Sequence, residues 1–177
     1  MTGKEEPQPG WPAVSLAFGP IPAIYVRPSL EHPSVRHQHV SIGGTMPDIP
    51  ADLKYSHDHL WARSDAGTGL VRIGVTDFAQ QSLGDVVDVT LPRPGDTVKA
   101  DGACGDIESV KSVSELIAPV TGTVRARNDN LTRTPELVNT DPYGQGWMFE
   151  VETDPATLSQ QLAALMDARA YRDLAGP

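Results

Sequence analysis

The chain has 177 residues, of which 39% are apolar, and its formal net charge at pH 7 is −9. This length suits one domain with an additional segment. The negative charge argues against a nucleic-acid-binding protein, because contacts to a phosphate backbone draw on lysine and arginine.

Residues 1–45 differ from the rest of the chain. They hold seven prolines and show no sustained period of two or of 3.6 residues, so we expect a disordered extension that cannot offset its ordering entropy. Met46 is a second candidate for the initiator, in which case the extension would be translated upstream DNA. The most apolar stretch, residues 11–26, is broken by three prolines and follows Glu5 and Glu6. It predicts neither a membrane span nor a targeting signal.

Residues 46–177 are expected to form one mainly β domain, because short apolar runs alternate with turn signals from Tyr55 onward. Asp141-Pro142-Tyr143-Gly144 has the residues that a type I turn favours. Strands are predicted over residues 60–62, 69–74, 85–91, 105–110, 112–117, 122–127 and 146–152.

Two helices are predicted from their capping residues. Thr76 suits the N-cap of a helix over residues 77–83, and Gly84 suits its C-terminal end. Asp154 suits the N-cap of a C-terminal helix that begins at Pro155. This second helix is expected to present one apolar stripe, formed by Leu158, Leu162 and Leu165.

The predicted hairpin of residues 105–110 and 112–117 places Lys111 at its tip. Residues 46–177 contain only two other lysines, Lys54 and Lys99. A lysine amine on a long flexible stem suits the covalent attachment of a mobile group. A solvated turn lysine is the plainer interpretation of this tripeptide, and the turn lacks the Asn-Gly or Asp-Gly of common two-residue hairpins.

The stretch Glu108-Ser109-Val110-Lys111-Ser112-Val113-Ser114 resembles the lipoylation motif of glycine cleavage H proteins. There the lysine typically lies in Glu-Ser-Val-Lys followed by Ala or Ser. The resemblance covers about residues 50–172, whereas residues 1–45 have no counterpart. Further segments that resemble the family are residues 74–80, 83–87, 118–122, 135–139, 141–144 and 146–147.

This resemblance implies a flattened barrel-sandwich hybrid of the lipoyl- and biotinyl-carrier type, with a few short helices and a C-terminal helix. It implies a non-catalytic, monomeric carrier in a bacterial cytoplasm, with lipoate bound covalently to Lys111. The implied partners are a pyridoxal-phosphate glycine decarboxylase, a tetrahydrofolate-dependent aminomethyltransferase, dihydrolipoamide dehydrogenase and a lipoate-attaching enzyme. The carrier would take the aminomethyl group of glycine from the first to the second and its dithiol to the third. It would also shelter this cargo in a cleft.

Two further features concern the partners. Glu108 and Glu115 flank the lysine loop and are candidates for recognition by the lipoate-attaching enzyme, although plain solvation would also explain them. Leu60 stands where the family usually has an acid, and the change is expected to alter a surface contact with a partner. The acidic domain as a whole is expected to dock by electrostatic steering on basic patches of successive enzymes.

The same residues bear on whether the chain is another kind of carrier or an enzyme. A lipoyl relay or specialised redox carrier would keep the fold and change the role. A biotin carrier usually has Met on both sides of the lysine, and a dehydrogenase lipoyl domain usually has Asp before it, so Val110 and Ser112 fit neither. No Ser-His-Asp set, phosphate loop or dinucleotide motif indicates a hydrolase or a nucleotide enzyme.

The remaining candidate residues are expected to be structural. His57 and His59 lie two apart but lack a third metal ligand of clear spacing. Asp85 and Asp88 are expected to be solvated strand residues. Trp61 and Trp147 are expected to serve the core or a turn, and the single cysteine, Cys104, to be a partly buried apolar residue.

Overall fold

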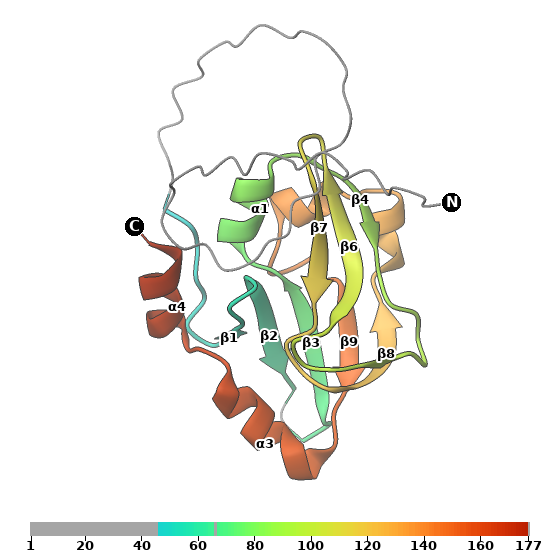
Figure 1. Cartoon of the computed structure of the whole chain (residues 1–177), viewed down its shortest axis with the longest axis vertical. Coiled ribbons are helices and arrows are strands. Elements are labelled where there is room, and N and C mark those ends of the chain that lie inside the picture. Colours follow the sequence, from blue (N-terminus) through green and yellow to red (C-terminus); the bar gives the residue numbers. More distant parts are fainter. Residues whose placement is uncertain (1–45, 66, 177) are drawn as a thin grey trace, which may run out of the picture.

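The structure is a computed structural model that describes residues 46–65 and 67–176. The extension predicted at residues 1–45 lies outside the described residues and stays a prediction. The described part is mainly β, with two antiparallel sheets (Figure 1). The larger sheet has the strand order β1 (Lys54–Tyr55), β2 (Leu60–Ser64), β3 (Leu70–Val75), β9 (Phe149–Glu152), β8 (Gly122–Arg127) and β5 (Thr97–Val98). The smaller has β4 (Val86–Thr90), β6 (Ala103–Ser109) and β7 (Val113–Ile117).

The two sheets face each other across the main hydrophobic core. Val71, Ile73 and Val151 come from the larger sheet, whereas Ile107 and Leu116 come from the smaller, and all five are buried in one cluster. The described strands do not close into a barrel. Two sheets that pack face to face without closing are the arrangement of a barrel-sandwich hybrid, so the predicted architecture is confirmed.

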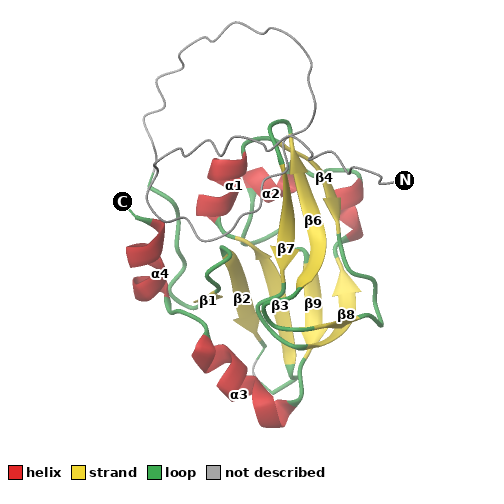
Figure 2. Ribbon diagram, viewed as in Figure 1, coloured by secondary structure: helices red, strands yellow, loops and turns green. Residues whose placement is uncertain are grey.

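Short helices complete the domain (Figure 2). They are α1 (Asp77–Leu83), the 3-10 turn η1 (Asp129–Thr132), α2 (Leu137–Thr140), α3 (Pro155–Ala164) and α4 (Ala168–Ala175). None of them, within the described residues, combines the length and hydropathy that crossing a membrane requires.

Local capping chemistry sets the bounds of α1 as predicted. Thr76 Oγ1 accepts a hydrogen bond from Ala79 N at 3.2 Å. Gly84 ends the helix with φ +77°, a conformation that glycine adopts without steric cost. The predicted turn at residues 141–144 is also present, with Gly144 N donating to Asp141 O at 3.2 Å.

One predicted strand begins later than expected. β9 starts at Phe149 rather than at residue 146. The amide groups of Gly146 and Trp147 are already used in the preceding turn, where they donate to Asp141 O and Gly144 O at 2.8 and 3.2 Å. These two residues therefore cannot join the ladder through their N–H groups.

The C-terminal helix is two helices rather than one. α3 begins at Pro155 with Asp154 as its cap, as predicted, but it ends at Ala164 and Leu165 is extended. Leu158 and Leu165 pack partly against the main core, and no residue of α3 is fully buried. The chain then restarts as α4, because Asp167 Oδ1 accepts from Ala170 N at 2.8 Å.

A second hydrophobic cluster holds α4 against the start of the domain. Its buried members are Ile49, Leu53, Tyr55, Trp61, Ala168 and Tyr171. The rings of Tyr55 and Tyr171 stack with centroids 4.5 Å apart. Tyr171 Oη lies 2.8 Å from His59 Nδ1 and 2.8 Å from Thr76 Oγ1. Tyr171 thus ties α4 to the N-cap of α1.

Two interpretations of individual residues are settled by burial. His59 is structural as expected, because it is only 3% exposed. The interpretation of Leu60 as a change at a surface contact is wrong, because Leu60 is 2% exposed and belongs to the main core. An apolar side chain at this position contributes to packing instead.

Acidification is expected to destabilise the domain through His59. Burial, and then the charge of His57, lowers the pKa of His59 below its ordinary value of 6.5. Since the unfolded chain takes up this proton at a higher pH than the folded chain, the contribution is fully present above pH 6.5. It is lost as the pH falls below 6.5, with a slope of at most about 1.4 kcal/mol per pH unit.

Urea unfolding of wild type, His59→Gln and the exposed control His57→Gln, each at pH 7.5 and 5.5, measures this effect. His59→Gln should lose less stability on acidification than wild type, whereas His57→Gln should keep most of the wild-type loss. Equal pH dependence in wild type and His59→Gln would contradict the assignment.

Candidate functional site

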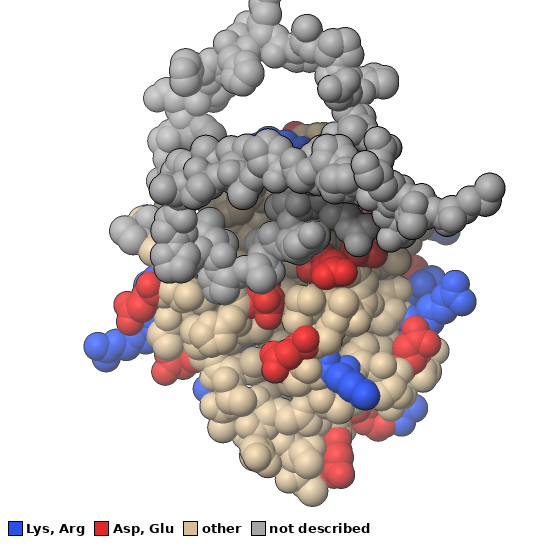
Figure 3. All heavy atoms as spheres, in the orientation of Figure 1, with Lys and Arg blue, Asp and Glu red and all other residues tan. Residues whose placement is uncertain are grey.

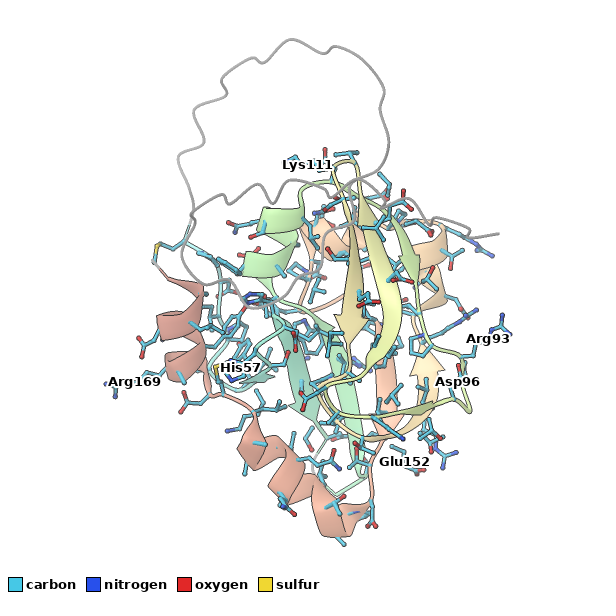
Figure 4. The ribbon with its side chains drawn as sticks, in the orientation of Figure 1. His57, Arg93, Asp96, Lys111, Glu152 and Arg169 are labelled. Atoms are coloured by element: carbon cyan, nitrogen blue, oxygen red, sulfur yellow. The ribbon has the colours of Figure 1, made fainter. Side chains whose placement is uncertain are left out.

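Lys111 lies at the tip of the β6–β7 hairpin, as predicted. The last paired residues of the two strands are Glu108 and Val113, so the tip consists of residues 109–112. Lys111 is exposed, and its neighbour Val110 is 64% exposed. Figure 4 shows Lys111 at one end of the molecule, far from the other side chains that it labels.

Ser109 builds the turn from its own side chain. Its Oγ accepts from the amides of Lys111 and Ser112, both at 3.2 Å. The same hydroxyl donates to Ser112 O at 3.2 Å. A serine hydroxyl can hydrogen-bond neighbouring backbone groups in this way, so the turn forms without Asn-Gly or Asp-Gly.

The tip rests on residues 84–86, which comprise the two-residue link after α1 and the first residue of β4. Val110 N donates to Asp85 O at 3.1 Å. The side chain of Lys111 runs over Gly84, where a Cβ would lie only 3.3 Å from Lys111 Nζ. The ammonium therefore lies at the C-terminal end of α1, whose partial negative charge favours a cation.

The attachment of an acyl group fits the surroundings of Lys111. No carboxylate of the described residues lies within 4.0 Å of its amine. A primary amine that is exposed and free of an ion pair is accessible to an acylating enzyme. The lysine of the motif is thus placed where an amide can form and extend outward.

Glu108 and Glu115 lie on the outer surface of the smaller sheet, together with two acids that sequence reasoning had not linked to them. Asp88 lies directly opposite Glu108, and Asp106 lies directly opposite Glu115. All four side chains are exposed. Directly opposed residues share one side of a sheet, so Asp88, Asp106, Glu108 and Glu115 form one acidic face. Figure 3 shows acidic side chains over the middle of this side of the molecule and most basic ones at its rim.

A cavity of about 620 Å³ lies at the opposite end of the hairpin. It is lined in part by Asp101, which precedes β6, and by Pro119, which follows β7. β6 alone is seven residues long, about 23 Å at 3.3 Å per residue. The structure therefore does not bring this cavity to Lys111.

The other candidate residues do not form a reactive site. His57 is exposed whereas His59 is buried, so they do not act as a pair. Within the described residues no group of three or more His, Cys, Asp or Glu side chains could hold a metal ion. Cys104 is half-buried as predicted, and burial raises the pKa of its thiol to about 12, which disfavours a nucleophilic thiolate.

Comparison with known proteins gives a consistent set of matches. The family model described as glycine cleavage H-protein matches residues 53–176. The glycine cleavage system H protein of Mycobacterium avium (strain 104) is 52% identical over 128 residues, which cover 72% of this chain and 96% of that protein. That of Mycobacterium tuberculosis (strain ATCC 25177 / H37Ra) is 49% identical over 130 residues, covering 72% of this chain and 96% of that protein. The crystal structure of a glycine cleavage system H protein from Mycobacterium marinum matches with a TM-score of 0.63 and 39% identity, covering 71% of this chain and 97% of that one.

Proposed function

The chain belongs to the glycine cleavage H-protein family, the lipoyl carriers of the glycine cleavage system that have no catalytic activity of their own, and we propose that its lipoyl group is attached to Lys111. The observation that carries this proposal is the position of Lys111, exposed at the tip of a hairpin and within the Glu-Ser-Val-Lys motif. The other two lysines of the domain fit less well. Lys54 is half-buried in β1, and Lys99 lies in a loop at the other end of the hairpin.

The role of the chain is to present the lipoyl group to the enzymes that act on it. When bound, the lipoyl group would supply a disulfide that accepts an aminomethyl unit on one sulfur as the other is reduced to a thiol, and both sulfurs are thiols once that unit has been passed on. Lys111 Nζ would hold this group through an amide, and the long lysine stem would give it reach. Ser109 and residues 84–86 keep the base of the stem in place, which raises the effective concentration of the group at a docked enzyme.

The proposed partners are the enzymes that load, discharge and reoxidise the carrier, together with the one that attaches lipoate. They are the pyridoxal-phosphate decarboxylase, the tetrahydrofolate-dependent aminomethyltransferase, dihydrolipoamide dehydrogenase and a lipoate-attaching enzyme. We place this work in a bacterial cytoplasm and assign it to a monomer. The match to mycobacterial relatives supports a bacterial setting.

Glu108 and Glu115 are proposed to be read by the lipoate-attaching enzyme as part of the acidic face. Like charges directly opposite each other destabilise a sheet, and the pairs Asp88–Glu108 and Asp106–Glu115 are of this kind. None of these four acids has an ion pair within the described residues. A face that costs stability and lies beside Lys111 suits the electrostatic steering of a basic partner.

Neutralising both glutamates is expected to slow lipoyl attachment. In Glu108→Gln/Glu115→Gln, kcat/KM for transfer to Lys111 should fall roughly three- to tenfold at low ionic strength, and the loss should shrink as salt is added. The matched control is Asp52→Asn/Asp65→Asn, which changes the net charge equally at two exposed acids outside the hairpin. If both double variants lose the same factor, overall charge rather than the acidic face is responsible.

Intact mass measurement with peptide mapping tests the attachment site itself. The chain is co-expressed with a lipoate ligase in medium containing lipoate, and a known lipoyl domain serves as the positive control. The expected result is one lipoyl adduct, located on the peptide that contains Lys111. An adduct on Lys99 or Lys54, or none under conditions that modify the control domain, would overturn the proposal.

A further inference from the structure

We propose that Asn139, in α2, is the positioning residue that fixes the hairpin tip carrying Lys111. The inference deepens the proposed function and rests on the role of Lys111 given there. Asn139 lies 28 positions after Lys111 in the chain, and its side-chain hydrogen bonds go to Gln80, Gly84 and Val86 rather than to the lysine. It acts through the segment on which the tip rests, residues 84–86.

The side-chain amide of Asn139 brackets this segment. Its Nδ2 donates to Gly84 O at 2.9 Å, and its Oδ1 accepts from Val86 N at 2.9 Å. Because a backbone N–H can only donate, the oxygen of the amide must face Val86 and the nitrogen must face Gly84. The same Nδ2 donates to Gln80 Oε1 at 3.0 Å, which joins α2 to α1 as well.

The residue between the two bracketed positions is the one that holds the tip. Asp85 O accepts the hydrogen bond from Val110 N, next to Lys111. Both neighbours of Asp85 are therefore bonded to one side chain from α2, and the acceptor for the tip is fixed from both sides. Figure 2 shows α1 and α2 together at the end of the smaller sheet where the hairpin turns.

A tip fixed in this way presents Lys111 in one arrangement to any enzyme that docks. If the segment is free to move, only a fraction of molecules offers the competent arrangement, and the apparent affinity falls by that fraction. The bracket thus links a short helix far along the chain to the efficiency with which Lys111 is modified.

Asn139→Asp tests the bracket with little change of shape. The variant keeps an oxygen for Val86 N but replaces the donor to Gly84 O and Gln80 Oε1 by a second acceptor. Amide hydrogen exchange of Val110 is measured by NMR in the full-length, unmodified chain, and kcat/KM for lipoyl attachment is measured in parallel. We expect exchange at Val110 to accelerate at least tenfold and kcat/KM to fall about five- to tenfold.

Asn128→Asp is the matched control, because Asn128 makes an equivalent set of contacts elsewhere. Its Nδ2 donates to Gln145 O and Trp147 O, both at 2.7 Å, and its Oδ1 accepts from Asn130 N at 3.3 Å. Exchange at Val110 should be unchanged in this variant. Ser109→Ala, which loosens the tip directly, should accelerate that exchange and serves as the positive control.

Two results would overturn the proposal. One is wild-type exchange at Val110 in Asn139→Asp, and the other is equal acceleration in Asn128→Asp, which would indicate a global loss of stability. If Asn139→Asp does not fold, native-state exchange of the wild type at low urea still decides the question. The amides of Val110 and Val86 must then open together with the Asn139 side-chain amide, and separate opening contradicts the bracket.

The hydrogen-exchange result does not depend on whether Lys111 is the attachment site. An unmodified Lys111 in wild type overturns the proposed function but leaves the exchange result interpretable. Unchanged exchange in Asn139→Asp removes the positioning role but leaves the attachment site standing.

Discussion

Lys111→Arg is expected to lose lipoyl attachment completely while the domain keeps its stability. The guanidinium does not form the amide, but it preserves the positive charge at the end of α1 and the length of an exposed side chain. The free energy of unfolding should change by less than about 0.5 kcal/mol, as for surface substitutions away from special features. Intact mass after co-expression with a lipoate ligase measures lipoyl attachment, and urea unfolding measures the free energy of unfolding.

Lys99→Arg is the control for this prediction, because Lys99 is exposed but lies far from the tip. It should be modified to the same extent as wild type. A lipoyl adduct that persists in Lys111→Arg and disappears in Lys99→Arg would move the attachment site and remove the basis of the carrier assignment at Lys111.

Trp61→Ala is expected to produce the largest loss of stability among the substitutions considered. Trp61 is 0% exposed, and its Nε1 donates to Pro142 O at 3.0 Å. Its ring lies directly on Gly74, where a Cβ would come within 2.7 Å of ring atoms, so the neighbouring strand has no side chain that could fill the space. Removal of a fully buried tryptophan of this kind costs about 3–5 kcal/mol.

Urea unfolding at pH 7.5 measures this loss, with Trp147→Ala as the comparison. Trp147 is only half-buried, and its ring faces Arg72, whose guanidinium carbon lies 5.0 Å from the ring centroid. We expect Trp147→Ala to lose less than half as much. Equal losses would mean that the second hydrophobic cluster is not organised around Trp61.

Lipoyl attachment and stability are expected to depend on different parts of the molecule. Lys111 lies on the smaller sheet at the hairpin tip, whereas Trp61 lies in the cluster that holds α4 against the larger sheet. At a low temperature at which it is folded, the Trp61→Ala variant should therefore still accept lipoate. The Lys111→Arg variant should not accept lipoate, although it is stable.

Features governed by residues close in sequence were predicted well. Thr76 and Gly84 bound α1 because capping uses the side chain and backbone of the helix ends themselves. The Asp141–Gly144 turn and the hairpin with Lys111 at its tip follow from the same kind of local chemistry. The carrier assignment came from the motif around Lys111 together with further resembling segments spread over about residues 50–172.

Features that depend on contacts between distant residues required the tertiary structure. The burial of Leu60 and the docking of α4 through Tyr171 and His59 depend on which faces of the sheets are covered. The pairing of Asp88 with Glu108 depends on the register between β4 and β6, which a bulge shifts.

The bracket formed by Asn139 shows most directly the difference between features set by neighbouring residues and features set by distant contacts. Its three hydrogen bonds reach residues 53 to 59 positions away, and nothing within a few residues of Asn139 indicates them. Local patterns determined that Lys111 stands at a hairpin tip, because a turn is made by the residues within it. Only long-range packing decided what holds that tip in place, because its supports come from helices elsewhere in the chain.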